Sequence, residues 1–445
     1  MAAMSARRMG HLKWLGLPVL ILLLGVSPAL AQQGLVLSGV GPVNRSMGGA
    51  STAAPIDASG AIHWNPASIV GLERSELEFG VELLFPRSTL SSTVAADSFG
   101  LGVPPVDLAG STETDAGAFA IPTVGFVYKP EESSWTFGLG VFGIGGFGVN
   151  YPQDSSNPVL AHAPPPLLGS GLGAVFSKLQ VTQIAPTAAY QLTDHLSIGF
   201  APTVTMADLS LDPAVFASPN ADGSFPSATH GRMFWGIGCQ AGVYYTTDSC
   251  WNFGASIKSP QWFETFRWRS VNSAGVARTV KVGFDYPLIL SFGTAYTGFE
   301  RWILAADFRL LDFENTDGFR SSGFDSTGAV KGLGWDSIFA LALGAQYQWT
   351  DRLSLRIGYD FNENPIDDSK TFFNAASPVI AEHTLSLGAT YKLTDTWKFS
   401  VAWVHAFENS ISGPMVFPGV GPVPGTSAKS EMLADALVVG MSVQF

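Results

Sequence analysis

Charged residues are scarce in this chain of 445 residues. They make up 13% of it, whereas soluble proteins carry about 25%. No grouping of Ser, His and Asp, no Gly-rich phosphate loop and no metal-ligand spacing stands out, so nothing points to an enzyme or a cofactor. Cysteine is rare as well. With Cys250 opposite Tyr245 in a predicted hairpin, Cys239 lies roughly 20 Å away, too far for a disulfide, and two free thiols are expected.

Long apolar runs are missing except near the N-terminus. Arg7, Arg8 and Lys13 lead into an apolar stretch from Leu15 to Val26, and Ala29-Leu30-Ala31 follows. This pattern predicts a signal peptide over residues 1–31 and a mature chain that begins at Gln32. The alternative is a membrane anchor, but about 12 apolar residues are too few for a helix that needs roughly 20 to span.

Hydrophobic residues nevertheless make up 46% of the chain, and 49 residues are glycine. A hydrophobic chain without long apolar runs is explained by alternating strands in lipid. Every second residue then meets hydrocarbon, while the backbone bonds to neighbouring strands. A hairpin corner appears three times: Tyr190-Gln191-Leu192-Thr193-Asp194, Tyr347-Gln348-Trp349-Thr350-Asp351 and Tyr391-Lys392-Leu393-Thr394-Asp395. Aromatic strand ends, short polar turns and period-2 patterning are typical of a transmembrane β-barrel.

The predicted fold is all-β, an antiparallel transmembrane barrel of about 14 strands. Six short turns alternate with seven long loops, which places both termini in the periplasm and the long loops outside. The strands are expected near 76–85, 117–129, 134–147, 177–192, 195–209, 231–246, 250–260, 286–297, 302–314, 336–349, 353–361, 382–393, 397–408 and 433–445.

Period-2 alternation also assigns the inward faces. Asp307 and Arg309 face inward on one strand, and Arg356 and Asp360 do so two strands away. A one-residue slip would move such an Arg into lipid, at a cost of about 2–4 kcal/mol. Small residues on the strand between them leave room for the two pairs to meet. One interpretation is an ion-pair network that braces the wall or grips a plug. The other is a cation site for a ligand carboxylate. Glu408 is expected inward as well.

Residues 32–75 do not alternate and are rich in Gly, Ala, Ser and Pro. A lumen enclosed by 14 strands is wider than that of the roughly eight-stranded barrels whose side chains fill it. The segment is therefore predicted to fold as a hatch inside the lumen, ahead of a barrel over residues 76–445. Asn65 and Pro66 are expected to shape this hatch, because Asn caps tight turns and Pro fixes φ.

The layout resembles the FadL/TodX family of outer-membrane transporters for long-chain fatty acids and other hydrophobic compounds. The matching residues are Gly48-Gly49-Ala50, Asp57 ahead of Asn65-Pro66-Ala67, Phe253-Gly254-Ala255-Ser256-Ile257-Lys258-Ser259-Pro260 and Tyr286-Pro287-Leu288. Ile257 and Lys258 stand where the family pattern has an aromatic and an Arg. The resemblance implies uptake by loop capture, interior binding, hatch movement and lateral release beside a kinked third strand. It also makes Lys258 a candidate interior cation.

Gly143, Gly145 and Gly146 interrupt the third predicted strand, where glycine often marks a bulge or bend. They are the candidates for the kink, although inward glycines could instead make room for the hatch. By the resemblance, two extracellular loops form the capture groove, and apolar residues in them fit that role. The candidates are Leu211, Val215, Phe216, Trp262, Phe263, Phe266 and Trp268. The alternative is an aromatic strand extension above the membrane.

The formal charge is −12, and 21 − 36 = −15 without the three cations of the first 31 residues. This acidity argues against a nucleic-acid partner.

The last residues alternate and end in Phe445, which resembles the signal read by barrel-assembly machinery. Further expected partners are outer-membrane lipid and a hydrophobic ligand, with the protein a monomer. Long-chain fatty acids lead among the ligands, and alkanes, aromatics and terpenoids remain open. A hydrophilic porin, an adhesin-like barrel and a lipid hydrolase are the rival functions.

Overall fold

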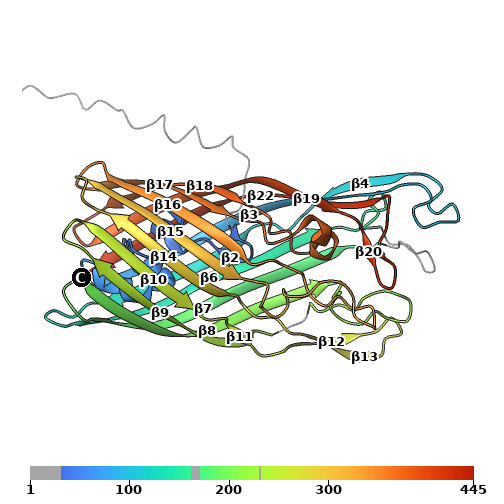
Figure 1. Cartoon of the computed structure of the whole chain (residues 1–445), viewed down its shortest axis with the longest axis horizontal. Helices are drawn as coiled ribbons and strands as arrows, with labels where there is room; N and C mark the ends of the chain where they lie inside the picture. Colours follow the sequence, from blue (N-terminus) through green and yellow to red (C-terminus); the bar gives the residue numbers. More distant parts are fainter. Residues whose placement is uncertain (1–31, 162–170, 230–231) are drawn as a thin grey trace, which may run out of the picture.

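Fourteen antiparallel strands close into a barrel in the computed structural model, which describes residues 32–161, 171–229 and 232–445 (Figure 1). The predicted fold class and strand number are confirmed. The predicted signal peptide lies outside the described residues. The barrel strands are β3 (Glu76–Val94), β5 (Phe119–Tyr128), β6 (Trp135–Tyr151), β7 (Val175–Gln191), β8 (Leu196–Asp212), β9 (Phe234–Thr246), β10 (Trp251–Lys258), β14 (Leu288–Tyr296), β15 (Trp302–Asp312), β16 (Ile338–Gln348), β17 (Leu353–Asn362), β18 (His383–Lys392), β19 (Trp397–Gly413) and β22 (Thr426–Gln444).

The repeated corner has one physical basis in all three copies. The threonine hydroxyl accepts the backbone N–H of the residue three positions later: Thr193 from Leu196 at 3.0 Å, Thr350 from Leu353 at 3.0 Å and Thr394 from Trp397 at 2.9 Å. A Thr at this point thus gives the first N–H of the next strand an acceptor and returns the chain tightly into that strand.

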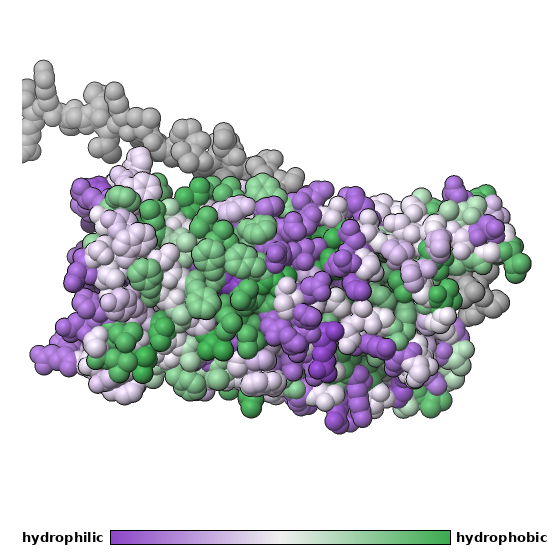
Figure 2. Space-filling model, in the orientation of Figure 1, coloured by the Kyte–Doolittle hydropathy of each residue, from purple (hydrophilic) through white to green (hydrophobic). Residues whose placement is uncertain are grey.

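Several strands are longer than predicted at the loop end, where β3, β6, β19 and β22 pass the expected boundaries. On β3 the outward residues are apolar up to Phe85 and then change to Arg87, Thr89 and Ser91. The apolar alternation therefore ends where the lipid ends, although the strand continues. In the view of Figure 2, the hydrophobic band covers the turn-side half of the barrel and hydrophilic residues follow it.

Shorter elements lie at the loop end. They are β4 (Leu108–Glu113), β11 (Trp262–Phe263), β12 (Phe266–Val271), β13 (Ala277–Val282), η2 (Asp368–Asn374), β20 (Val416–Phe417) and β21 (Gly421–Pro422). β12 and β13 pair only with each other, as a separate hairpin.

The segment before β3 folds inside the lumen (Figure 1), as predicted. Its elements are β1 (Gln32–Gln33), β2 (Val36–Leu37), α1 (Gly41–Ser46), α2 (Ala58–Trp64) and η1 (Pro66–Gly71). Nearly all of these residues are buried against the wall. Among the described residues, no helix has the length and apolar character needed to cross a membrane.

Inward glycines let the hatch approach the wall. A Cβ at Gly344, Gly358 or Gly388 would overlap Met47, Gly48 or Ser46, respectively. Gly48 and Gly49 themselves have φ values of +65° and +86°, which glycine adopts at little cost. Part of the glycine content is thus explained by a backbone-to-backbone fit between hatch and barrel.

Two details of register differ from prediction. Glu408 is exposed rather than inward, because a bulge between Ala406 and Asn409 shifts the face of β19. Phe253 rather than Cys250 faces Tyr245, since Cys250 lies in the turn. Both cysteines are free in the described structure.

Candidate functional site

Asp307 and Arg309 hold the hatch rather than face open lumen. Asp307 Oδ2 accepts the backbone N–H groups of Ser51 at 2.8 Å and Thr52 at 2.9 Å, and also the Thr52 hydroxyl at 2.8 Å. Arg309 donates to Asp307 at 2.9 Å and to the Gly49 carbonyl at 2.7 Å. Both side chains are fully buried. This pair therefore clamps the turn that follows α1.

Contrary to expectation, Arg356 and Asp360 bond to groups outside that pair, although Asp360 still attracts Arg309 at longer range. Arg356 donates to Gln346 and Thr390, each at 2.7 Å, and Asp360 accepts from Gln33 at 2.8 Å. In the described parts of the chain no ion pair joins either residue to Asp307 or Arg309. The physical reason is the hatch, whose Met47–Gly48 backbone occupies the space over the small residues of β16 and β17.

Lys258 also faces the hatch. Its Nζ lies 3.3 Å from His63 Nδ1, and the guanidinium of Arg309 stacks on Trp64 at 3.4 Å from the ring centre. Such a stack is favourable because the ring face carries negative charge. All three predicted interior cations are therefore occupied by the wall or hatch.

The predicted hatch residues shape its turns. Asp57 caps α2 by accepting the Gly60 N–H, and Asn65 caps η1 by accepting the Ala67 N–H at 3.1 Å. Asn65 also donates to the carbonyls of Thr52 and Val243, each at 2.9 Å, which ties the hatch to β9. Pro66 occupies the first turn of η1, where a missing N–H costs nothing.

One row of functional candidates was missed in the sequence. Glu76, Glu78 and Glu82 alternate along β3 and are all buried, Glu76 beside Gln444 and Lys398 of the wall and the other two against the hatch. Glu82 forms a 2.6 Å ion pair with Arg45 of α1, and Glu78 accepts the Ser59 N–H at 3.3 Å. Period-2 spacing on a predicted strand was the available signal, because three carboxylates on one face cannot point into lipid.

The predicted kink coincides with a bulge in β6. Phe142 pairs with Gln183 and Phe147 with Leu179, so one extra residue lies on β6 between Gly143 and Gly145. Because β7 keeps its alternation, the bulge switches the inward set of β6 from even to odd numbers. Phe147 and Val149 then point inward.

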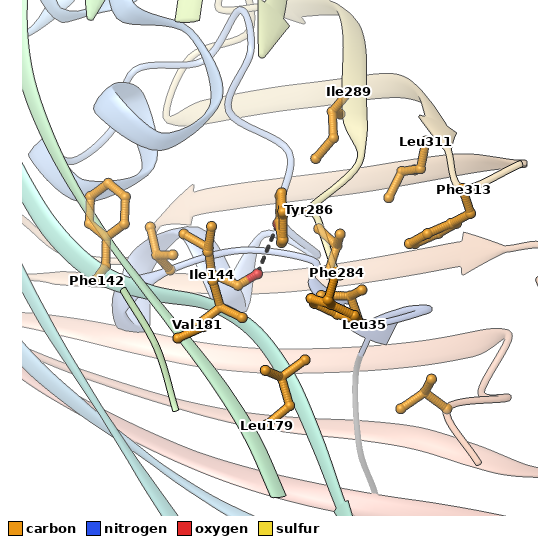
Figure 3. Packing of buried hydrophobic residues seen from close by; sticks show 14 of the residues in the cluster. Leu35, Phe142, Ile144, Leu179, Val181, Phe284, Tyr286, Ile289, Leu311 and Phe313 are labelled. Carbon is orange, nitrogen blue, oxygen red and sulfur yellow. Dashed lines mark hydrogen bonds between the residues drawn. The ribbon is translucent and has the colours of Figure 1, made fainter. Parts of the chain in front are cut away.

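The bulge is held by groups from across the lumen (Figure 3). The Tyr286 hydroxyl donates to the Ile144 carbonyl at 3.0 Å, and Gly146 N–H donates to the Leu35 carbonyl at 2.9 Å. Val36 bridges to Gly145. A Cβ at Gly145 would overlap the Leu35 carbonyl. The first residues of the hatch thus complete the irregular part of β6.

A small cavity of about 130 Å³ opens beside this bulge. β5 pairs with β6 only up to Thr123–Phe142, and the next residue of β5 is Pro122, which lacks a donor for a neighbouring strand. This side cavity is lined by Gln32 of the hatch, by Ile121 of β5 and by Gly143, Gly145, Gly146 and Phe147 of β6, among others. The gap between the strands adjoins it.

A larger cavity of about 420 Å³ lies among the loops and is mainly apolar. Its volume is in the range of roughly 300–1,000 Å³ usual for small-molecule sites. Leu211 at the end of β8 and Val215 and Phe216 in the loop after it line the cavity, together with Phe147 and residues of five further loops such as Phe324, Phe372 and Phe417. Asp222 is the one charged side chain among the described lining residues. Phe147 is common to this loop cavity and the side cavity.

The second predicted capture loop differs from expectation. Phe266 and Trp268 are buried, at 0% and 1% exposure, and pack on Phe234 beneath the loops rather than offering free aromatic surface. Phe263 packs on the same cluster. Trp262 is exposed and pairs with Ile237 on the outer face. This loop is largely a continuation of the barrel wall. Asp285 anchors it by accepting the Phe263 N–H at 2.8 Å, and burial raises the pKa of that carboxyl.

The family model for outer membrane protein transport proteins (OMPP1/FadL/TodX) matches residues 25–445. The chain belongs to this family. Outer membrane protein P1 of Haemophilus influenzae is 28% identical over 245 residues, which cover 54% of this chain and 51% of that protein. This FadL/TodX-family chain therefore spans about half the length of the curated relatives it matches.

Solved structures agree with the fold. The toluene transporter TodX of P. putida has a TM-score of 0.65 at 17% identity, covering 92% of this chain and 99% of that one. A FadL homologue from Pseudomonas aeruginosa has a TM-score of 0.68 at 13% identity, covering 93% and 99%. The toluene transporter TbuX of Ralstonia pickettii has a TM-score of 0.64 at 18% identity, covering 92% of this chain and 99% of that one. At these identities the likeness concerns the fold alone, that of an outer-membrane transport barrel.

Proposed function

We propose that this outer-membrane barrel takes up hydrophobic compounds, which enter through the loop cavity and leave sideways into the membrane. The observation that carries the proposal is Phe147, whose side chain borders both the loop cavity and the side cavity. Two apolar spaces with a common wall form a route that avoids water. An apolar molecule gains by remaining in such surroundings, because each buried CH₂ is worth about 0.8 kcal/mol.

The exit faces the outer half of the lipid band. The top of β5 pairs with β3 at Leu84–Phe119, and the last β5–β6 pair is level with Gly80. Outward residues of β3 are lipid-like from Phe79 to Phe85. The gap between β5 and β6 thus spans heights at which hydrocarbon surrounds the barrel, which supports lateral release there.

The hatch is proposed to control this exit. Leu35 and Val36 bond to β6 at the bulge, and Gln32 lines the side cavity. Withdrawal of these residues would free the N–H of Gly146 and widen the space beside Gly143 and Gly145. The glycines give that part of β6 little side-chain bulk to fill the opening.

The ligand is proposed to be uncharged. Resemblance favours long-chain fatty acids, but an ionised carboxylate needs a partner when buried. The described lining of the loop cavity offers only Asp222, and the interior cations Lys258, Arg309 and Arg356 are engaged elsewhere. TodX and TbuX are toluene transporters by name, in keeping with this choice. Fatty acid is the alternative.

Uptake by cells tests the proposal. A strain that lacks the gene, with and without a plasmid copy, would be given a labelled arene, a labelled alkane and labelled palmitate. We expect the copy to raise uptake of the two hydrocarbons several-fold and that of palmitate little. Equal uptake of all three with and without the gene would refute transport, whereas a gain for palmitate alone would establish the fatty-acid alternative.

We further propose that residues 1–31 are cleaved, that barrel-assembly machinery reads the strand ending in Phe445, and that the barrel works as a monomer. The sequence pattern supports the first two. Closure of β22 onto β3 supports the third, because a closed barrel leaves no strand edge that a second copy must cover.

A further inference from the structure

The hairpin β12–β13 has two unlike faces. Phe266, Trp268, Val280 and Val282 are buried on one face, and Val282 lines the loop cavity. Arg267, Arg269, Thr279 and Lys281 are exposed on the other. Because the buried face points to the cavity, the exposed face continues the outer surface of the barrel wall. The cations on it are therefore turned away from the transport route.

These cations are close together, and the neighbouring acid Glu264, which also attracts Arg267, is already paired with Arg232. Arg267 stands directly opposite Lys281, and Arg269 is two residues further along the same face. Like charges directly opposite each other destabilise a strand pair. Two other cations at the loop end do pair with acids, Lys178 with Asp208 at 2.9 Å and Arg320 with Asp317 at 2.8 Å. Within the described ranges the three hairpin cations form no ion pair, although the chain carries 36 acidic residues.

The height of the hairpin is fixed by two contacts. Glu264 N–H donates to the Trp235 carbonyl at 2.9 Å, and Trp235 and Trp262 are exposed aromatics at the top of the lipid band. Trp268 Nε1 donates to the Leu209 carbonyl at 3.2 Å, and Leu209 lies three residues beyond Met206, the partner of Trp235. At about 3.3 Å per residue this is roughly 10 Å along the strand, or about 7–8 Å above the aromatic level because barrel strands tilt by about 35–45°. Lipid headgroups occupy that zone.

We propose that the outer face of β12–β13, formed by Arg267, Arg269 and Lys281, binds the phosphate groups of the outer-leaflet glycolipid, the phosphorylated disaccharide of lipid A. Arginine suits phosphate because its planar fork donates two parallel hydrogen bonds, and lysine adds a compact charge. A bound phosphate would separate and neutralise the opposed Arg267 and Lys281. The lipid would also brace the hairpin whose other face closes the loop cavity. The inference does not depend on the identity of the transported compound.

Binding of lipid A to the purified, folded barrel in mild detergent tests the inference, with bound copies counted by native mass spectrometry. The ligands are bisphosphorylated lipid A and the same lipid without phosphates. The variant is Arg267→Gln/Arg269→Gln/Lys281→Gln. The matched control, Arg301→Gln/Arg352→Gln/Lys392→Gln, removes three exposed cations at the turn end. Folding of each is checked by the mobility shift of unheated samples in SDS gels.

We expect the wild type and the control to prefer the phosphorylated lipid by tenfold or more, and the hairpin variant to lose that preference. Raising the salt from 0.05 to 0.5 M should weaken wild-type binding, because added ions screen exposed charges. The inference is overturned if the hairpin variant keeps the preference, if the control loses it equally, or if the dephosphorylated lipid binds the wild type as tightly. Should the triple variant not fold, the single Arg269→Gln exchange is expected to weaken phosphorylated-lipid binding at least threefold, and an unchanged affinity would count against the site.

Discussion

Glycine determines how closely the hatch and the barrel wall approach each other. The Gly48 backbone lies against Gly358, and Gly344 faces Met47 in the same way. Neither contact leaves room for one more carbon atom. In interiors packed to this density, adding or removing a single methyl group changes the stability of the protein. The hatch is therefore seated in one position by backbone shape, while Asp307 and Arg309 add polar bonds at its turn.

We predict that Gly358→Ala destabilises the barrel by about 1–3 kcal/mol, the usual cost of overpacking a well-filled interior. Gly283→Ala is the matched control, because a Cβ there has nothing within 4 Å. The measurement is the urea midpoint of the refolded protein, followed by loss of the heat-modifiable gel band. A Gly358→Ala protein as stable as the control would mean that the hatch yields easily, and that its fit is looser than the contacts indicate.

At the scale of single elements, β6 changes character at its bulge. Below Gly143 it is an ordinary wall strand with lipid-facing Phe137, and above it the inward Phe147 separates two cavities.

We predict that Phe147→Ala joins these cavities and raises the uptake rate of a bulky arene several-fold over that of a small one. Rates come from whole cells with equal amounts of folded protein. Phe137→Ala, on the outer face, should leave the ratio unchanged, and a similar effect of both variants would disprove that Phe147 limits passage between the two cavities.

The strands were predictable because lipid enforces alternation, and so were the inward charges Asp307, Arg309, Arg356 and Asp360. The upper parts of β3 and β6 were not, because above the lipid either face can be polar and the period fades. The glycines of β6 indicated irregular backbone. What they could not show is that Leu35 and Tyr286, far away in sequence, would bond to it.

The loop cavity was beyond sequence reasoning for a similar reason. Its lining comes from six separate loops, so residues such as Phe225, Leu333 and Met415 meet only after the barrel has arranged them. Phe266 and Trp268 show the converse error. They form an apolar run in a loop, which indicated a capture surface, but strand-like alternation with Arg267 and Arg269 places them inside. That alternation was visible in the sequence and favoured the strand-extension alternative.

For the whole molecule, uptake without an aqueous pore depends on a lumen that stays filled. The hatch occupies it with buried helices, an Arg45–Glu82 ion pair of 2.6 Å and the contacts to β15. Fourteen strands enclose more space than wall side chains can fill, so the hatch is the seal. The route that we propose for apolar molecules lies between the loops and β6, to one side of this seal.

Deletion of residues 32–75, with residues 1–31 retained, tests this arrangement in planar bilayers. We predict that the intact barrel conducts almost no ions, and that the deleted barrel opens a steady pore, because nothing else described in the lumen blocks it. The same deletion should abolish the selectivity of cells for apolar over polar solutes. A folded control with Glu408→Gln, changed on an exposed position of β19, should remain closed. If the intact barrel conducts as well as the deleted one, a hydrophilic porin becomes the better description, since ions would then pass where only an apolar molecule is expected to leave sideways.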